Sequence, residues 1–195
     1  MSAFIAPPTR IPLLLKAGIW ISEKITGKPM LPARLLAWYP KAALGSAALE
    51  GLVAHQDGKL DKRMLKLVRL SASFAAACPF CIDMNSTIYR ETGITDAEFL
   101  ALQNQTDLDT VSTLSIREKL AVRYAQLIST TPLQFPPEFI AEITAHFTER
   151  EIVVLASTAA QVNYWARLIQ ALGIPPAGLS DGCPIKPYRQ VPEDH

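Results

Sequence analysis

Apolar residues recur every three or four positions along most of this chain, which is the spacing of one face of an α-helix. Between residues 61 and 76, for example, one stripe consists of Leu65, Val68, Ala72 and Ala75. No segment shows the strict alternation of apolar and polar residues that is typical of a half-buried β-strand. The pattern therefore predicts an all-α fold.

Proline, glycine and capping residues divide the chain into helical segments. Ser115 and Glu118 form one capping box, and Thr148 and Glu151 form a second. The helix after Thr148 has an apolar face made of Ile152, Leu155, Ala159, Val162, Ala166 and Ile169. The expected helices cover residues 12–26, 31–55 (one or two helices), 61–76, 78–93, 95–102, 115–130, 137–146 and 149–172.

A chain of 195 residues is long enough for one substantial core, and we expect a single domain, 1–195. Helices at 12–55 precede its central part, and a Pro- and Gly-containing arm at 175–195 follows it. The 19 basic and 18 acidic residues nearly balance, so charge gives no reason to expect binding to nucleic acid or to an anionic membrane. The apolar run 13–21 is too short to span a bilayer, and we expect a cytoplasmic protein.

The most informative chemistry lies in the segment Cys78-Pro79-Phe80-Cys81. Spacing of i and i+3 places both sulfurs on one face of a helix, close enough to form a disulfide. Proline is favoured at the first position of a helix, so Cys78 is expected at the N-cap. The N–H groups and the positive end of the helix dipole lower the pKa of a cysteine there. The motif predicts redox chemistry, with Cys78 as the more easily formed thiolate.

Other interpretations of the cysteines make different predictions. A zinc site requires four ligands, and only Cys183 and three scattered histidines are available to complete one, so we expect no metal and no cofactor. Two inert, buried thiols are the stronger alternative, because free cysteine behaves as a small hydrophobic residue. Cys183 has no acid–base residue beside it, and we interpret it as a spare thiol.

Residues 67–70, Leu-Val-Arg-Leu, followed by Cys-Pro-Phe-Cys-Ile-Asp-Met at 78–84, resemble the carboxymuconolactone decarboxylase superfamily, in particular its alkylhydroperoxidase-D-like branch. Supporting matches lie at 117–120, 147–152 and 163–167, so the likeness covers residues 60–172. The resemblance implies an all-helical fold that assembles into homo-oligomers (dimers, trimers or hexamers). It also implies hydroperoxide reduction through the cysteine pair, with an external dithiol or redox protein as reductant.

Carried over residue by residue, the resemblance makes Cys81 the thiol that attacks peroxide and Cys78 the resolving thiol. The thiol pKa argument favours Cys78 instead, and both assignments stay open at this point. Two family positions are changed: a relay histidine is replaced by Asn85 and a glutamate by Lys66. Asparagine does not shuttle a proton, whereas the ammonium of lysine stabilises a thiolate that it approaches. Asp83 lies about 200° around the helix from Cys81 and is a poor substitute base.

The sequence thus predicts a thiol-dependent oxidoreductase, with peroxiredoxin-type hydroperoxide reduction or thiol–disulfide exchange at Cys78 and Cys81. Asn85 and Lys66 are expected to support them. The first alternative is a binding or assembly protein on the same fold, which the substitutions at 66 and 85 favour. A lactone decarboxylase is the second, and it is disfavoured because that activity does not use a cysteine pair.

Overall fold

The computed structural model describes residues 3–51 and 56–180, and in this part of the chain the regular structure is helical. The helices are α1 (Leu13–Thr26), α2 (Leu31–Leu36), α3 (Pro40–Gly51), α4 (Lys62–Ala75), α5 (Pro79–Ser86), α6 (Asp96–Leu102), α7 (Ile116–Ile128), α8 (Pro137–His146) and α9 (Glu149–Ala171). Two short 3₁₀ helices, η1 (Tyr89–Thr92) and η2 (Leu108–Thr110), lie in the connections. Within the described ranges no strand is present, which confirms the predicted all-α fold.

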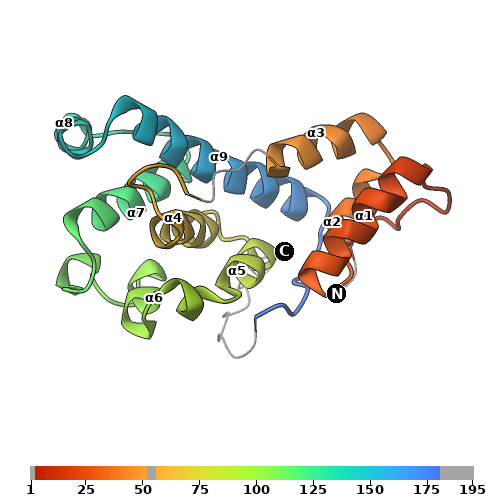
Figure 1. Ribbon diagram of the computed structural model, residues 1–195, viewed down its shortest axis with the longest axis horizontal. Coiled ribbons are helices and arrows are strands. Elements are labelled where there is room, and N and C mark those ends of the chain that lie inside the picture. The colour runs from red at the N-terminus through yellow and green to blue at the C-terminus, as the bar shows by residue number, and fades with distance from the viewer. Residues whose placement is uncertain (1–2, 52–55, 181–195) are drawn as a thin grey trace, which may run out of the picture.

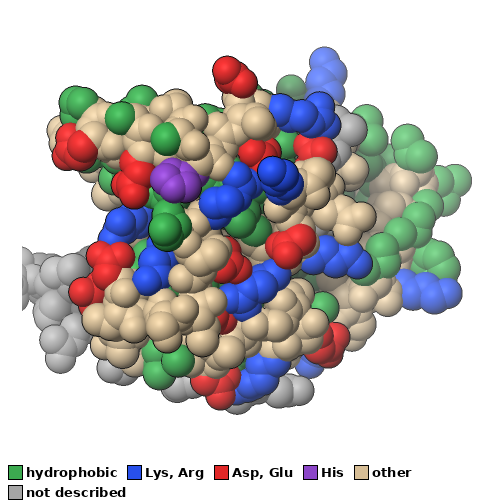
Figure 2. Space-filling view, turned by 60° about the vertical axis from the view of Figure 1, so that its left-hand side comes forward, with side chains coloured by type: hydrophobic (Ala, Val, Ile, Leu, Met, Phe, Trp, Pro, Cys, Tyr) green, Lys and Arg blue, Asp and Glu red, His purple; other side chains and the backbone are tan. Residues whose placement is uncertain are grey.

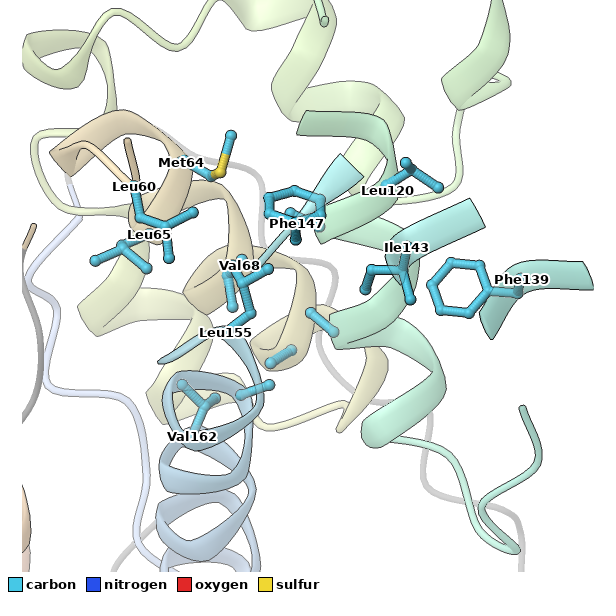
Figure 3. Close-up of a cluster of buried hydrophobic side chains, with 14 residues drawn as sticks. Leu60, Met64, Leu65, Val68, Leu120, Phe139, Ile143, Phe147, Leu155 and Val162 are labelled. Carbon is cyan, nitrogen blue, oxygen red and sulfur yellow. The ribbon is translucent and has the colours of Figure 1, made fainter. Parts of the chain in front are cut away.

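Helix α4 lies at the centre of the molecule, surrounded by α5, α7 and α9, while α1–α3 form one end (Figure 1). One face of α4 packs into a cluster that also contains side chains of α7, α8 and α9 (Figure 3). Leu65, Val68 and Leu155 in this cluster are almost completely buried. The opposite face of α4 packs against η1 and α6. Helix α4 is therefore buried on two sides, so it provides a rigid base for α5.

Side-chain caps fix the ends of several helices, as the sequence pattern predicts. The carboxylate of Asp61 accepts the N–H of Met64 at the start of α4, and both predicted capping boxes, at Ser115 and Thr148, are formed. A third box joins Thr95 and Glu98 at the start of α6. These caps place the helix starts within one residue of the predicted positions.

Two details of the sequence prediction are wrong. The helix that begins after Cys78 ends at Ser86 and not at Gly93, because Ile88 adopts a left-handed conformation with a φ of 53° and the chain continues as η1. Ala75 was expected on the buried stripe of α4 but is exposed. The side chain of Trp20 is 61% exposed, so it is not part of the core.

Helix α1 contains no buried residue and is held mainly through its C-terminal end. There Glu23 accepts two hydrogen bonds from Arg34, at 2.6 and 3.0 Å, and one from the N–H of Met30. No helix in the described ranges is long and apolar enough to cross a membrane. The cytoplasmic location and the single domain remain predictions.

Candidate functional site

The two cysteines lie at the start of α5, directly after a sharp break in the chain. Helix α4 ends at Ala75, and Ala77 adopts a left-handed φ of 47°, which is uncommon for a residue other than glycine. Cys78 then takes an extended conformation at the N-cap of α5, and Pro79 occupies the first helical position. Backbone strain of this kind is often found at functional sites. The break places Cys78 at the N-terminus of α5, as the Cys-Pro sequence predicts.

The thiol group of Cys78 is surrounded by hydrogen-bond donors. Its Sγ accepts the N–H of Cys81 at 3.2 Å, which is the usual N-cap contact. The thiol of Cys81 and the N–H groups of Phe80 and Cys81 lower the pKa of Cys78, although burial acts in the opposite direction. The same contact to Cys78, together with burial, raises the pKa of Cys81. The N-cap geometry therefore favours negative charge on Cys78 over Cys81.

Both thiols are buried in an apolar environment. Cys78 is 0% and Cys81 is 4% exposed, and both are free cysteines. The cluster around them brings together residues of α2, α5 and α9 with the segment after α9: Met30, Leu35, Phe80, Ala166, Ile169 and Ile174. Trp165 of α9 packs against this cluster from the side. An apolar environment of this kind excludes water from the thiols and suits an apolar reactant.

Asp83 fastens the chain after α9 to the helix that carries the cysteines. Its carboxylate is 2% exposed and accepts backbone N–H groups of Ala177, Leu179 and Ser180 at 2.9–3.1 Å, together with the Ser180 hydroxyl at 2.8 Å. Burial would raise the pKa of Asp83, but these donors hold it below its usual value. We call residues 174–180 the C-terminal strap.

From the sequence, Asp83 was considered only as a base, and its role in holding the C-terminal strap was not identified. The strap also confirms the expected extended arm, as far as residue 180. The remainder of that arm, with Cys183, and His55 lie outside the described residues.

Asn85 lies one helical turn after Cys81 and performs a structural task. Its amide nitrogen donates to the carbonyl of Cys81 and to the hydroxyl of Ser73 on α4, each at 3.0 Å. The hydroxyl of Ser73 in turn donates to the carbonyl of Arg69 at 2.7 Å. Asn85 thus ties α5 to α4.

Lys66 lies on the same face of α4 as Arg69 and Ser73, at spacings of three and seven residues. Its side chain is partly buried, and burial, with the nearby positive charge of Arg69, lowers the pKa of Lys66 to about 8. Among the described residues Lys66 has no hydrogen-bond or ion-pair partner. Its ammonium is therefore not committed to a structural contact.

The other polar residues considered in the sequence have structural contacts. Glu118 completes its capping box and pairs with Arg63 at 2.7 Å, which confirms its capping role. Asn163 donates to Ser129 at 2.9 Å and so joins α9 to the end of α7. No group of three or more histidine, cysteine or acidic side chains suited to a metal ion occurs in the described part of the chain.

Comparison with known proteins agrees with this architecture. A model of the carboxymuconolactone decarboxylase family matches residues 40–110, which include both cysteines. The uncharacterized protein YnjA of Escherichia coli K12 is 27% identical over 176 residues, which cover 90% of this chain and 94% of YnjA.

Two solved structures have a similar fold. One is the alkylhydroperoxidase AhpD core protein of Ralstonia eutropha JMP134, an uncharacterized peroxidase-related protein, with a TM-score of 0.75 and 16% identity. The other is the debrominase Bmp8, with a TM-score of 0.76 and 18% identity. Each comparison covers 90% of this chain and 93% of the other. The carboxymuconolactone decarboxylase family model thus matches the part of the chain that carries the cysteine pair, and the chain as a whole has the alkylhydroperoxidase-D-like all-α fold.

Proposed function

We propose that this protein is a thiol-dependent oxidoreductase in which Cys78 and Cys81 alternate between dithiol and disulfide, with a hydroperoxide as the oxidant. The observation that carries the proposal is the N-cap position of Cys78, whose sulfur accepts the N–H of Cys81 and whose pKa is lowered. A thiolate is the reactive form of cysteine. A second thiol within the same helical turn is placed to complete the reaction.

The reaction balances with residues of this chain alone. The Cys78 thiolate attacks the terminal oxygen of the hydroperoxide, the O–O bond breaks, and the alkoxide leaves as an alcohol after taking a proton. The resulting sulfenic acid condenses with the thiol of Cys81, which forms the disulfide and releases water. Two thiols and one hydroperoxide thus give one disulfide, one alcohol and one water. An external dithiol or redox protein then reduces the disulfide by exchange.

The geometry of this chain favours Cys78 as the attacking thiol, whereas the family resemblance implies Cys81. The N-cap contact stabilises negative charge on Cys78 only, and Cys81 loses its proton less readily in the same environment. The larger thiolate fraction expected for Cys78 at neutral pH therefore supports Cys78 as the attacking thiol. A binding or assembly role on the same fold is the alternative, and it predicts thiols that do not react with peroxide.

The proposal predicts a loss of two thiols per chain when the reduced protein meets a small excess of organic hydroperoxide. Free thiols are counted with a chromogenic disulfide in denaturant, before and after the reaction. Cys183→Ser should still lose two thiols, whereas Cys81→Ser should form a sulfenic acid on Cys78 that a dimedone-type probe traps. Unchanged thiol counts over hours would reject the redox function and favour the binding role.

The proposed reaction requires that reactants reach the two buried thiols. The C-terminal strap supplies Ile174 and the partly buried Ala177 to the cluster around the cysteines, and Asp83 holds it there. Because hydrogen bonds to a charged group contribute about 1.5–3 kcal/mol each, the strap is held firmly but reversibly. We expect the reductant to reach the thiols when the strap moves away.

Asp83→Asn should loosen the strap, because an amide NH₂ group faces backbone donors where the carboxylate accepts. We expect a bulky disulfide reagent to modify the pair about tenfold faster in the native protein. The matched control is Asp96→Asn, which alters an exposed ion pair with Arg90 instead. Equal labelling rates in wild type and Asp83→Asn would show that the strap does not limit access.

We also propose that the protein forms a homo-oligomer through its N-terminal helices. Large apolar side chains of α1 are widely exposed, among them Leu13 (83%), Trp20 (61%) and Ile25 (80%). Figure 2 shows apolar side chains gathered at the right-hand end of the molecule, whereas the face toward the viewer carries interspersed charges. Exposed apolar area on this scale is typical of a protein interface.

Light scattering of the purified protein should therefore give a multiple of the 21.4 kDa chain mass. The double variant Trp20→Glu with Ile25→Glu should shift the protein to monomer, because it places charges in the apolar contact. Val153→Glu is the matched control, since Val153 is 62% exposed on α9, away from this surface. A monomeric wild-type protein would contradict the proposed assembly.

A further inference from the structure

Glu50, near the C-terminal end of α3, is an exposed residue whose carboxylate is nevertheless held by the body of the protein. Its Oε2 accepts a hydrogen bond from Gln161 Nε2 at 2.6 Å and another from Trp165 Nε1 at 3.0 Å. Both donors belong to α9, and Gln161 is 6% exposed. Two donors from one helix thus converge on a single carboxylate oxygen.

One cation of α4 lies beside this contact, and a second lies one helical turn earlier on the same helix. Arg69 is close enough to Glu50 for their charges to attract, and that attraction opposes the effect of burial, which lowers the pKa of Arg69. Lys66, one turn away on the same face, has no partner of its own among the described residues. Gln161 and Trp165 thus donate to the carboxylate of Glu50, Arg69 attracts it, and Lys66 adds a second positive charge one turn away on α4. We call these four residues the carboxylate receptor.

The receptor and its occupant differ in how firmly they are held. Gln161 and Arg69 belong to α9 and α4, which form the core of the fold. Ser46 is the one buried residue among the described side chains of α3, where its hydroxyl and that of Tyr164 lie 2.6 Å apart. Helix α3 is therefore attached by few contacts, so its carboxylate can leave while the receptor stays in place.

The receptor lies next to the cysteine pair. Trp165, which donates to Glu50, also packs against the apolar cluster that contains Cys78 and Cys81. On the other side, Asn85 and Ser73 connect the backbone of Cys81 to the backbone of Arg69 through consecutive hydrogen bonds. Lys66 and Ser73 are seven residues apart on α4, which is about 10 Å along a helix. Side-chain contacts of Trp165 and of the Asn85–Ser73 pair therefore connect the receptor to the cysteine pair.

We propose that Lys66, Arg69, Gln161 and Trp165 bind the carboxylate of the substrate, and that Glu50 occupies this receptor in the absence of substrate. The thiol pair would then act on hydroperoxides that carry a carboxylate at the far end of an apolar chain. This substrate class rests on the proposed redox function, but the receptor itself does not depend on it. Glu50 acts as an internal competitor that the substrate carboxylate displaces.

Equilibrium binding tests the receptor without any reaction at the thiols. Decanoate and decanol, which share an apolar chain and differ in charge, are titrated into the reduced protein by calorimetry. We expect decanoate to bind at least tenfold more tightly than decanol. Glu50→Gln should tighten decanoate binding several-fold, because the internal carboxylate no longer competes.

Variants of the cations give the matched comparison. Lys66→Met should weaken decanoate binding about tenfold, and Lys66→Arg should restore most of it because the positive charge returns. Lys62→Met, an exposed lysine one turn earlier on the same helix, should leave the binding constant unchanged. Equal binding of decanoate and decanol, or weaker decanoate binding in Glu50→Gln, would overturn the receptor.

Reaction rates distinguish a failure of the carboxylate receptor from a failure of the redox function. Rates of disulfide formation are compared for linoleic acid hydroperoxide and its methyl ester, and the acid should react faster in wild type. That ratio should fall toward one in Lys66→Met. If neither hydroperoxide reacts while decanoate still binds through Lys66, the redox function fails and the receptor stands. If both react equally and decanoate does not bind, the receptor fails and the redox function stands.

Discussion

The turn between α4 and α5 is the constraint on which the candidate site depends. Helix α4 is buried on two sides, so its direction is fixed by the core, and α5 starts only three residues after it ends. Ala77 accepts a left-handed conformation to make this turn. As a result Cys78 is the N-cap of α5, and the N–H groups of the first helical turn point at its sulfur. Packing of a central helix thereby sets the charge state of a thiol.

The cysteine pair is surrounded by an inner layer of tightly packed helices and an outer layer that is held by fewer contacts. Helices α4, α5 and α9 form a rigid inner layer, and the carboxylates of Glu50 and Asp83 help to attach α3 and the C-terminal strap to it. Both carboxylates accept hydrogen bonds from elements more than 90 residues away in the sequence. The strap packs directly against the cluster around the thiols, whereas α3 is linked to that cluster through the contact of Glu50 with Trp165.

Local chemistry explains what the sequence revealed. The N-cap role of Cys78 and the capping boxes follow from residues within one helical turn, so they were predicted correctly. The end of α5 was predicted wrongly, because Ile88 takes a left-handed conformation that its β-branched side chain disfavours. The contacts of Glu50 with Trp165 and of Asp83 with the strap were invisible for another reason. They join residues far apart in sequence, and no local pattern records such a pairing.

The central claim is that the fold makes Cys78 the thiolate of the pair, and a thiolate titration tests it most directly. Thiolate absorbance in the ultraviolet is followed against pH in Cys183→Ser, which keeps both cysteines of the site. Because the N-cap contact lowers the pKa of Cys78, absorbance should persist below the ordinary cysteine pKa of about 8.5, and Cys78→Ser should abolish it. Titration at or above the ordinary value, or a low-pH signal that only Cys81→Ser removes, would contradict the account.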